Sequence, residues 1–133
     1  MSQSNLELIK NLYAAFARGD GPAVAAGMDP AIVWNEAENF PYADRNPYTG
    51  PAAIAEGIFA RFATEWDKFQ VNPAEYLDAG DTIVVTGRYT GTYKPTSKSI
   101  NAQFAHFWSI SNGKVRRFQQ YTDTAQAKRV VQG

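Results

Sequence analysis

Residues 81–123 constrain the fold most, because they carry the pattern of a β-meander. Residues 82–86 are rich in β-branched side chains, which suit a half-buried strand. Residues 100–110 then alternate between two faces, as the side-chain period of a strand requires. The pair Asn112-Gly113 is typical of a tight hairpin turn, because both residues tolerate positive φ. We therefore predict consecutive antiparallel strands, with the return strand at residues 115–121.

The two faces of the strand at residues 100–110 have similar character. One face carries Ile100, Ala102, Phe104, His106, Trp108 and Ile110, and the other carries Asn101, Gln103, Ala105, Phe107 and Ser109. Neither face is charged throughout, so neither resembles an ordinary solvated surface. We expect one face to meet helices or a ligand and the other to meet a second subunit.

Composition excludes several classes of protein. The 133 residues predict a single domain over residues 1–133, and 13 basic residues balance 13 acidic ones. This balance argues against nucleic acid and anionic membranes as partners, because both need a basic surface. The chain has no Cys and one His, so thiol chemistry and His-rich metal sites are excluded, and we expect no cofactor. No signal peptide or membrane-spanning run is visible, which predicts a cytoplasmic protein.

The first half of the chain alternates helical and extended patterns. Apolar residues at helical spacing predict a helix that begins at a capping box at Ser4 and ends at Gly19, followed by a short helix at residues 22–28. Residues 32–36 read as a strand, and Pro51 begins a long helix with an apolar stripe that reaches Trp66.

The remaining segments complete an α+β order. Residues 37–50 are aromatic and irregular, and they form either a loop packed on its own aromatic side chains or a lid over a cavity. Pro73 makes residues 69–77 an edge or bulged strand. Residues 91–99 read as a loop, and a short helix follows Asp123. Helices followed by a run of strands indicate helices packed on one face of a mostly antiparallel sheet.

This order, together with particular residues, resembles the nuclear transport factor 2-like superfamily, and within it the SnoaL-like polyketide cyclase and ketosteroid isomerase-like group. The residues that carry the resemblance are Tyr13 to Asp20, Tyr48 to Ile54, Ala105 to Trp108, Asn112 to Val115 and Gln120 to Asp123. The resemblance implies a cone, in which a curved sheet wraps around the helices and an apolar pocket opens at the wide end. It also implies a homodimer through the convex face of the sheet. Members include isomerases, cyclases, epoxide hydrolases, dehydratases and binding modules, so the fold alone does not give the function.

The resemblance also assigns roles to single positions. A ketosteroid isomerase has a carboxylate base, a tyrosine and a protonated aspartate at positions that align with Asn35, Leu12 and Ala105, so we predict a different activity. The base of the cyclases aligns with Asp123, which is alternatively an N-cap for the last helix. An epoxide hydrolase needs an Arg flanked by two Asp, and Arg88 has no such partners in the sequence pattern.

The isomerase pocket face, transferred to this chain, points Gln103, Ala105, Phe107, Phe118 and Gln120 inward. Arg88 either joins them or faces solvent. The predicted ligand-binding residues are Asn35, Tyr42, Arg88, Gln103, Phe107, Phe118, Gln120, Phe59 and Phe62. The convex face would then carry Phe104, His106, Trp108 and Tyr121 and form the dimer interface.

The sequence thus predicts a domain that binds a small hydrophobic molecule. If the domain is an enzyme, we expect cofactor-free acid–base chemistry of the isomerase or cyclase type. The candidates for proton transfer are Asp123, Glu36 and His106, although His106 is alternatively a packed interface residue. The rival hypotheses are a ligand-binding module without catalysis and a module whose aromatic sheet face binds another protein.

Overall fold

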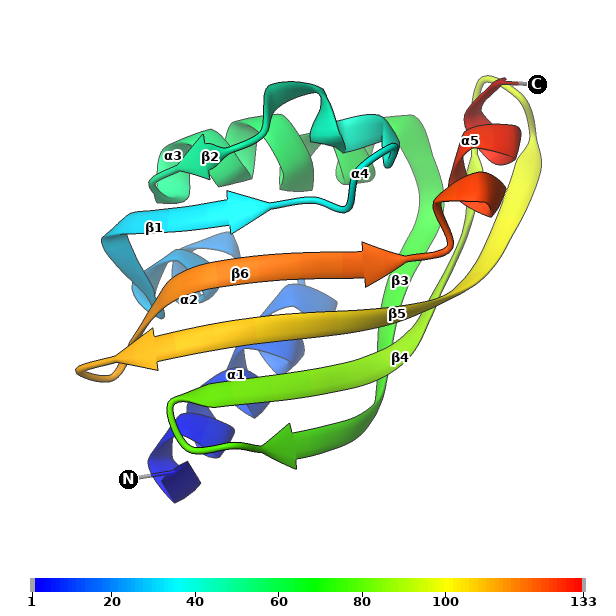
Figure 1. The fold of residues 1–133 in the computed structure, drawn as a ribbon. Helices are drawn as coiled ribbons and strands as arrows, with labels where there is room; N and C mark the ends of the chain where they lie inside the picture. Colours follow the sequence, from blue (N-terminus) through cyan, green and yellow to red (C-terminus); the bar gives the residue numbers. More distant parts are fainter. Residues whose placement is uncertain (1, 133) are drawn as a thin grey trace.

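The computed structural model describes residues 2–132, which form a curved sheet with α1 and α2 on one side (Figure 1). The helical elements are α1 (Ser2–Ala17), α2 (Gly21–Ala26), the 3₁₀ turn η1 (Pro41–Arg45), α3 (Pro51–Ile54), the π-helical turn η2 (Ala55–Phe59), α4 (Ala60–Glu65) and α5 (Thr124–Gln132). The strands are β1 (Met28–Asn35), β2 (Tyr48–Thr49), β3 (Trp66–Asp78), β4 (Thr82–Tyr93), β5 (Lys98–Ser111) and β6 (Lys114–Thr122).

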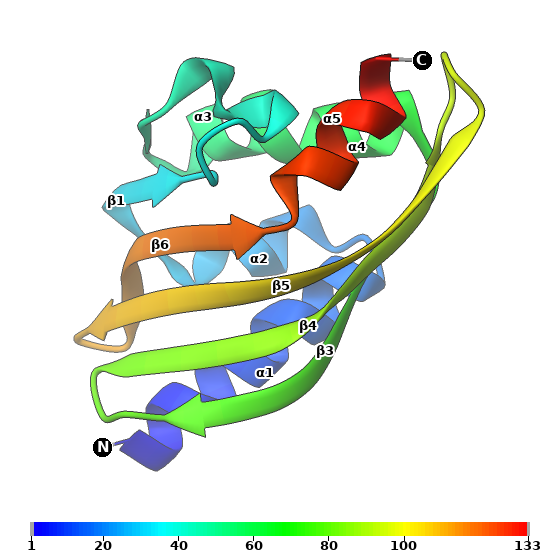
Figure 2. The ribbon, with the colours of Figure 1, turned by 45° about the vertical axis from the view of Figure 1, so that its right-hand side comes forward.

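The sheet has six strands in the order β2-β1-β6-β5-β4-β3. β1 pairs with β6 in parallel, and the other neighbours are antiparallel, so the sheet is mixed. The consecutive strands β4 to β6 form the predicted meander, with β3 added at its edge, and the α+β prediction is confirmed. The long strands β3, β4 and β5 bend strongly along their length (Figure 2).

The turns explain where several elements begin and end. Gly19 has a φ of 72° directly after α1, where a residue without a Cβ adopts the left-handed conformation at least cost. Asp20 then caps α2 by accepting a hydrogen bond from the Ala23 N–H. The capping box predicted at Ser4 is wrong, because α1 already includes this residue. The hairpin prediction is confirmed, with φ values of 53° at Asn112 and 75° at Gly113.

Three predicted boundaries differ from the structure. The helix that begins at Pro51 contains the π-helical turn η2, and Trp66 opens β3 rather than ending that helix. Met28 belongs to β1, not to the second helix. β4 continues to Tyr93, so much of the predicted loop at residues 91–99 is paired with β5. Pro73 lies in the edge strand β3 beside a register shift, as predicted.

The main core lies between the concave face of the sheet and the helices. Figure 2 shows α1 running beneath the bend of β3 and β4, and contacts between α1 and these strands hold the helix there. Ile83 and Val85 of β4 are completely buried on this face, and Trp34 stacks on Phe118 with ring centroids 3.7 Å apart. Across residues 2–132, no helix is long and apolar enough to cross a membrane.

Candidate active site

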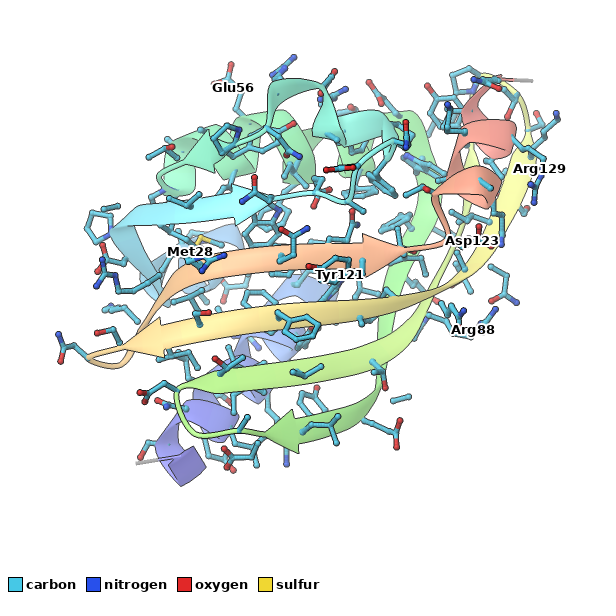
Figure 3. All side chains as sticks on the ribbon, viewed as in Figure 1. Met28, Glu56, Arg88, Tyr121, Asp123 and Arg129 are labelled. Carbon is cyan, nitrogen blue, oxygen red and sulfur yellow. The ribbon has the colours of Figure 1, made fainter. Side chains whose placement is uncertain are left out.

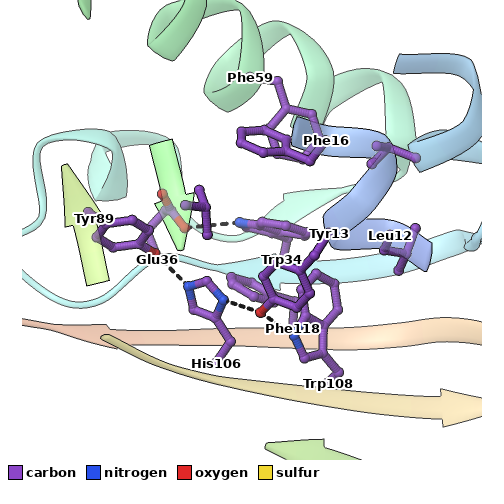
Figure 4. A pocket seen from close by; sticks show the side chains of 12 residues that line it. Leu12, Tyr13, Phe16, Trp34, Glu36, Phe59, Tyr89, His106, Trp108 and Phe118 are labelled. Carbon is purple, nitrogen blue, oxygen red and sulfur yellow. Dashed lines mark hydrogen bonds between the residues drawn. The ribbon is translucent and has the colours of Figure 1, made fainter. Parts of the chain in front are cut away.

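An apolar cavity with a free volume of about 60 Å³ lies on the concave face of the sheet. Its walls come from α1, α2, β1, η2 and the inward side chains of β3 to β6, together with Glu36 just beyond β1 (Figure 4). The lining residues are Leu12, Tyr13, Phe16, Val24, Trp34, Glu36, Phe59, Val71, Tyr89, His106, Trp108 and Phe118. An apolar cavity with a few polar groups is the usual composition of a small-molecule site.

Glu36 is the acidic side chain of this cavity. It follows β1 directly and shares the inward face with Trp34, because side chains two residues apart in extended chain lie on one side. The Trp34 indole Nε1–H donates to Glu36 Oε2 over 3.0 Å. Glu36 is only 3% exposed, and its Oε1 atom has no hydrogen-bond partner within residues 2–132. Burial raises the pKa of this carboxyl to about 7, against a lowering by the Trp34 hydrogen bond.

His106 lies between two tyrosine hydroxyls. Its Nδ1 atom is 2.6 Å from the Tyr13 hydroxyl oxygen, and its Nε2 atom is 2.5 Å from that of Tyr89 (Figure 4). Burial lowers the pKa of His106 to about 3, so the ring is neutral at pH 7. A neutral ring with this pKa is a weak base, although its position in the cavity is close to where a substrate would bind.

Both tyrosines have one further hydrogen bond each. The Trp108 indole Nε1–H donates to the Tyr13 oxygen over 3.0 Å, and the Gln120 side-chain amide donates to the Tyr89 oxygen over 2.9 Å. Burial is the largest cause that raises the pKa of both tyrosines well above the usual range, so both carry their hydroxyl proton near neutral pH. Gln120 is fixed in turn, because its Oε1 accepts from the Ala37 N–H over 3.0 Å.

The predicted assignment of the β5 faces is wrong. Phe104, His106 and Trp108 are 4%, 4% and 5% exposed on the concave side, whereas we predicted them at the convex dimer interface. Gln103 and Phe107 are exposed on the convex side, whereas we predicted them in the pocket. A shift of one residue moves every side chain of a strand to the opposite face, which explains why the error affects the whole strand.

Two further inward predictions fail for the same reason. Asn35 is half-buried on the opposite side of β1 from Trp34 and Glu36, and it does not line the cavity. Arg88 is exposed, and its guanidinium donates to the side-chain and backbone oxygens of Asn101 over 2.8 and 3.1 Å. The solvent-facing alternative for Arg88 is therefore the correct one, and Figure 3 shows its side chain pointing away from the sheet.

Asn35, Leu12 and Ala105 align with the acid–base groups of a ketosteroid isomerase, and none of these side chains can replace those groups. The structure brings polar side chains into the cavity one residue further along at each place, namely Glu36, Tyr13 and His106. At these three places the cavity therefore holds a carboxyl group, a hydroxyl group and an imidazole ring.

Asp123 lies outside the cavity, which contradicts its assignment as a cavity acid. Its Oδ1 accepts from the Gln126 N–H over 3.1 Å at the start of α5, and its Oδ2 accepts from the Gln126 side chain. These two hydrogen bonds are the main cause that lowers the pKa of Asp123. The N-cap interpretation is therefore confirmed.

Tyr42 and Phe62 belong to a second aromatic cluster beside the cavity, not to its lining. The Tyr42 hydroxyl donates to Glu65 over 2.5 Å and accepts from Trp66, and Phe62 stacks on Phe69 with ring centroids 4.0 Å apart. These contacts hold the segment at residues 37–50 against α4. They favour the packed-loop interpretation of this segment over the lid.

The sequence analysis placed some cavity residues correctly and missed others. The structure places Phe59 and Phe118, both predicted to bind ligand, in the lining, and Gln120 directly behind Tyr89. Tyr13 and Tyr89 line the cavity and are not among the predicted ligand-binding or catalytic residues. The alternation in β4 contains the missing signal, because Tyr89 lies on the same face as the β-branched residues Ile83 and Val85.

Comparisons with known proteins identify the family. The family model for the SnoaL-like domain matches residues 9–118. The chain belongs to this family. A nuclear transport factor 2-like protein from Burkholderia thailandensis has a structure similar to this SnoaL-like chain, with 37% identity and a TM-score of 0.92 over 96% of this chain and 97% of that one. The resemblance predicted from the sequence motifs is thereby confirmed.

Two further solved structures have the fold of this SnoaL-like protein. TerC, co-crystallised with polyporic acid, is 26% identical, with a TM-score of 0.85 over 98% of this chain and 99% of TerC. A Jannaschia protein described as a SnoaL-like polyketide cyclase is 16% identical, with a TM-score of 0.83 over 97% of this chain and 92% of that one. At this identity the second likeness concerns the fold alone. No curated protein matches the sequence.

We also searched the described residues for a cluster of side chains that could bind a metal ion. Residues 2–132 contain no group of three or more His, Asp or Glu side chains arranged to hold a metal ion. The titratable side chains that line the cavity are Glu36, Tyr13, Tyr89 and His106.

Proposed function

We propose that this SnoaL-like protein is a cofactor-independent enzyme that transfers a proton next to the carbonyl group of a small hydrophobic compound, as isomerases and cyclases do. The observation that carries the proposal is the Glu36 carboxyl group, which lies in an apolar cavity with a pKa raised to about 7. A general base works best when its pKa is close to the working pH. Of the three predicted candidates, Asp123 is outside the cavity and His106 is too weak a base.

In the proposed reaction, ionised Glu36 takes a proton from a carbon next to the carbonyl group. The electron pair of the broken C–H bond moves toward the carbonyl oxygen, and an enolate forms. A hydroxyl donor from Tyr13 or Tyr89, both in the cavity lining, would stabilise the developing negative charge. An isomerase then returns the proton from Glu36 to another carbon. In a cyclase the enolate carbon attacks a second carbonyl carbon of the same molecule, the π electrons of that carbonyl group move to its oxygen, and this oxygen takes the proton from Glu36.

Cavity size argues for a small substrate. The free volume of about 60 Å³ corresponds to about two water molecules at ~30 Å³ each. A fused four-ring steroid would need the walls to move apart, so we propose an activity other than authentic ketosteroid isomerisation. That TerC has been crystallised with polyporic acid supports a small organic ligand for the family.

Hydrogen–deuterium exchange at the α-carbons of acetone, a ketone small enough for this cavity, tests this function. Proton NMR in D₂O monitors the exchange. We expect the wild-type protein to accelerate it, and we expect the acceleration by Glu36→Gln to be roughly 10²- to 10⁴-fold smaller. Asp123→Asn is the matched control, because it also neutralises a carboxylate but lies outside the cavity, and it should keep the wild-type rate. Equal rates for wild type and Glu36→Gln would contradict the proposal.

A ligand-binding module without catalysis is the main rival. It predicts that a hydrophobic molecule stays bound to the purified protein in native mass spectrometry without being converted. Incubating the extracted molecule with wild type and Glu36→Gln separates the two functions. Conversion by the wild type alone supports the enzyme, and unchanged ligand with both proteins supports the binding module.

We also propose that two copies of the chain associate through the convex face of the sheet. The corrected convex face carries Phe107 and Tyr121, which are 40% and 55% exposed and lie edge to face with ring centroids 5.6 Å apart. Figure 3 shows Tyr121 on the sheet face away from α1. Light scattering should give a dimer mass for wild type and a monomer mass for Phe107→Asp. A monomeric wild type would contradict this proposal and favour a surface for another protein.

A further inference from the structure

The hydrogen-bonded series of side chains around His106 has one proton more than it has contacts. The series runs Trp108, Tyr13, His106, Tyr89, Gln120, with donor–acceptor distances of 3.0, 2.6, 2.5 and 2.9 Å. The two outer groups, an indole and an amide N–H, are donors only at these contacts, so each tyrosine oxygen accepts one hydrogen bond from outside. The two inner contacts then have to be shared among the remaining protons.

A count of these protons leaves one over. A neutral imidazole has one N–H and one acceptor nitrogen. Two hydroxyl protons and one ring proton are therefore available for two oxygen–nitrogen contacts. One tyrosine donates to the acceptor nitrogen, and the ring N–H donates to the oxygen of the other. The oxygen of that second tyrosine then accepts two hydrogen bonds, one from the ring and one from the outer donor. Its own hydroxyl proton therefore points away from this series of hydrogen bonds.

The two tautomers differ in which tyrosine keeps the spare proton. With the ring proton on Nε2, His106 donates to Tyr89, Tyr13 donates to Nδ1, and the Tyr89 proton is spare. With the ring proton on Nδ1, the spare proton belongs to Tyr13. Because both tyrosines line the cavity, either tautomer supplies a hydroxyl donor to it.

Glu36 selects between the two tautomers. Its negative charge acts on the Tyr89 hydroxyl and contributes to raising the pKa of that tyrosine, whereas it is absent from the causes that act on Tyr13. A spare proton is most stable where it faces negative charge. Figure 4 shows Glu36 and Tyr89 on the same side of the cavity, with Tyr13 across His106 from them.

We infer that His106 is a positioning residue, whose single ring proton on Nε2 holds the Tyr89 oxygen and leaves the Tyr89 hydroxyl as a free donor inside the cavity. The site then offers a ligand one hydroxyl donor and one carboxylate acceptor. This pair fits a compound with a carbonyl or other acceptor oxygen close to an acidic C–H bond. The role of this donor in catalysis rests on the proposed function, whereas the position of the ring proton does not.

The test is a long-range proton–nitrogen NMR spectrum of the ring, recorded without ligand at pH 9, where Glu36 is ionised. His106 is the only histidine in the sequence, so its two ring nitrogens give the only imidazole signals. The titratable groups that face the ring, Tyr13 and Tyr89, have pKa values well above the usual range and stay protonated. We expect a neutral ring with Nε2 protonated. A proton on Nδ1, or on both nitrogens, would overturn the inference.

Two matched variants sharpen this test. In Tyr89→Phe the Nε2 proton loses its acceptor, so we expect the ring proton to move to Nδ1, where Tyr13 accepts it, and the two nitrogen shifts to exchange. In Tyr13→Phe the bond to Tyr89 remains, so the spectrum should keep the wild-type pattern. A histidine that merely fills space would respond to neither, and an unchanged tautomer in Tyr89→Phe would overturn the inference. If Tyr89→Phe does not fold, the wild-type and Tyr13→Phe spectra decide.

This experiment separates the inference from the proposed function. It needs no substrate and no turnover, so a failure of ketone exchange would contradict the function and leave the tautomer result standing. A wrong tautomer together with ketone exchange that depends on Glu36 would contradict only the role of His106.

Discussion

The two faces of β5 have similar residues and opposite environments. On the concave face, Phe104, His106 and Trp108 are almost completely buried, and they contribute to the cavity and its hydrogen-bond chain. On the convex face, Phe107 is 40% exposed, and its aromatic contact is with Tyr121, itself 55% exposed. Alternation thus defines which side chains lie together, but aromatic content alone does not say which face receives the helices.

The largest expected difference between these faces is in how acid affects the free energy of unfolding, because His106 is buried on the concave face. Its pKa is about 3 in the folded protein and 6.5 in the unfolded chain, so the stability it provides is complete above pH 6.5 and is lost as pH falls toward 3. The shift corresponds to about 5 kcal/mol. Urea unfolding at pH 6.5 and pH 3.5 should show a markedly smaller loss for His106→Phe than for wild type. Equal losses would mean that the ring is not buried in neutral form.

Alanine substitutions compare the two faces directly. Trp108→Ala removes an indole that is 5% exposed, packs on Phe118 with ring centroids 4.6 Å apart and donates to Tyr13. We expect a loss of about 3–5 kcal/mol in the free energy of unfolding. Phe107→Ala, one residue away on the convex face, should change the monomer by less than about 0.5 kcal/mol. Chemical denaturation at low protein concentration measures both, and a reversed order would contradict the assignment of the faces.

The contribution of Glu36 to the free energy of unfolding should depend on pH with the opposite sign. Its folded pKa of about 7 lies above the ordinary 4.5, so the stability that it contributes is complete below pH 4.5 and is lost as pH rises through 7. The shift amounts to about 3 kcal/mol. Relative to Glu36→Gln, the wild-type protein should therefore lose about this amount between pH 4 and pH 8. If the difference in the free energy of unfolding between the two proteins did not change with pH, the Glu36 carboxylate would be exposed to water in the folded protein.

Asp123→Asn should have the smallest effect of this series. The side chain lies outside the cavity and caps α5, and asparagine is as good an N-cap as aspartate. We expect a melting temperature close to the wild-type value, measured by circular dichroism, and an unchanged rate of ketone exchange. A selective loss of exchange would return Asp123 to the list of catalytic candidates.

The fold could be predicted from the sequence because most local signals agreed with it. The β-branched run in β4, the alternation in β5 and the turn at Asn112-Gly113 together specify a meander, and Gly19 and Pro51 mark helix boundaries correctly. The signals failed where the tertiary structure decides between local alternatives. Met28, for example, has no strong preference for a strand, but its pairing with Val115 of β6 places it in β1.

The site was predicted less well, because its residues come together only through the register of the sheet. Val85 of β4 pairs with His106, and His106 pairs with Gln120 of β6. Tyr89 lies further along β4 on the same face as Val85, and its hydroxyl reaches both His106 and Gln120. The isomerase pattern selected Asn35, whereas its neighbour Glu36 lines the cavity. The burial that changes the pKa of Glu36 depends on the packed helices, which no local motif encodes.

The central claim is that Glu36 is a proton acceptor inside an apolar cavity, and the titration of its side-chain carboxyl carbon by ¹³C NMR tests it most directly. Comparison with Glu36→Gln assigns the signal. We predict a midpoint near pH 7, because burial raises the pKa of this group to about 7. A midpoint near the ordinary value of 4.5 would mean that water solvates the carboxylate, and it would contradict both the cavity and the proposed chemistry.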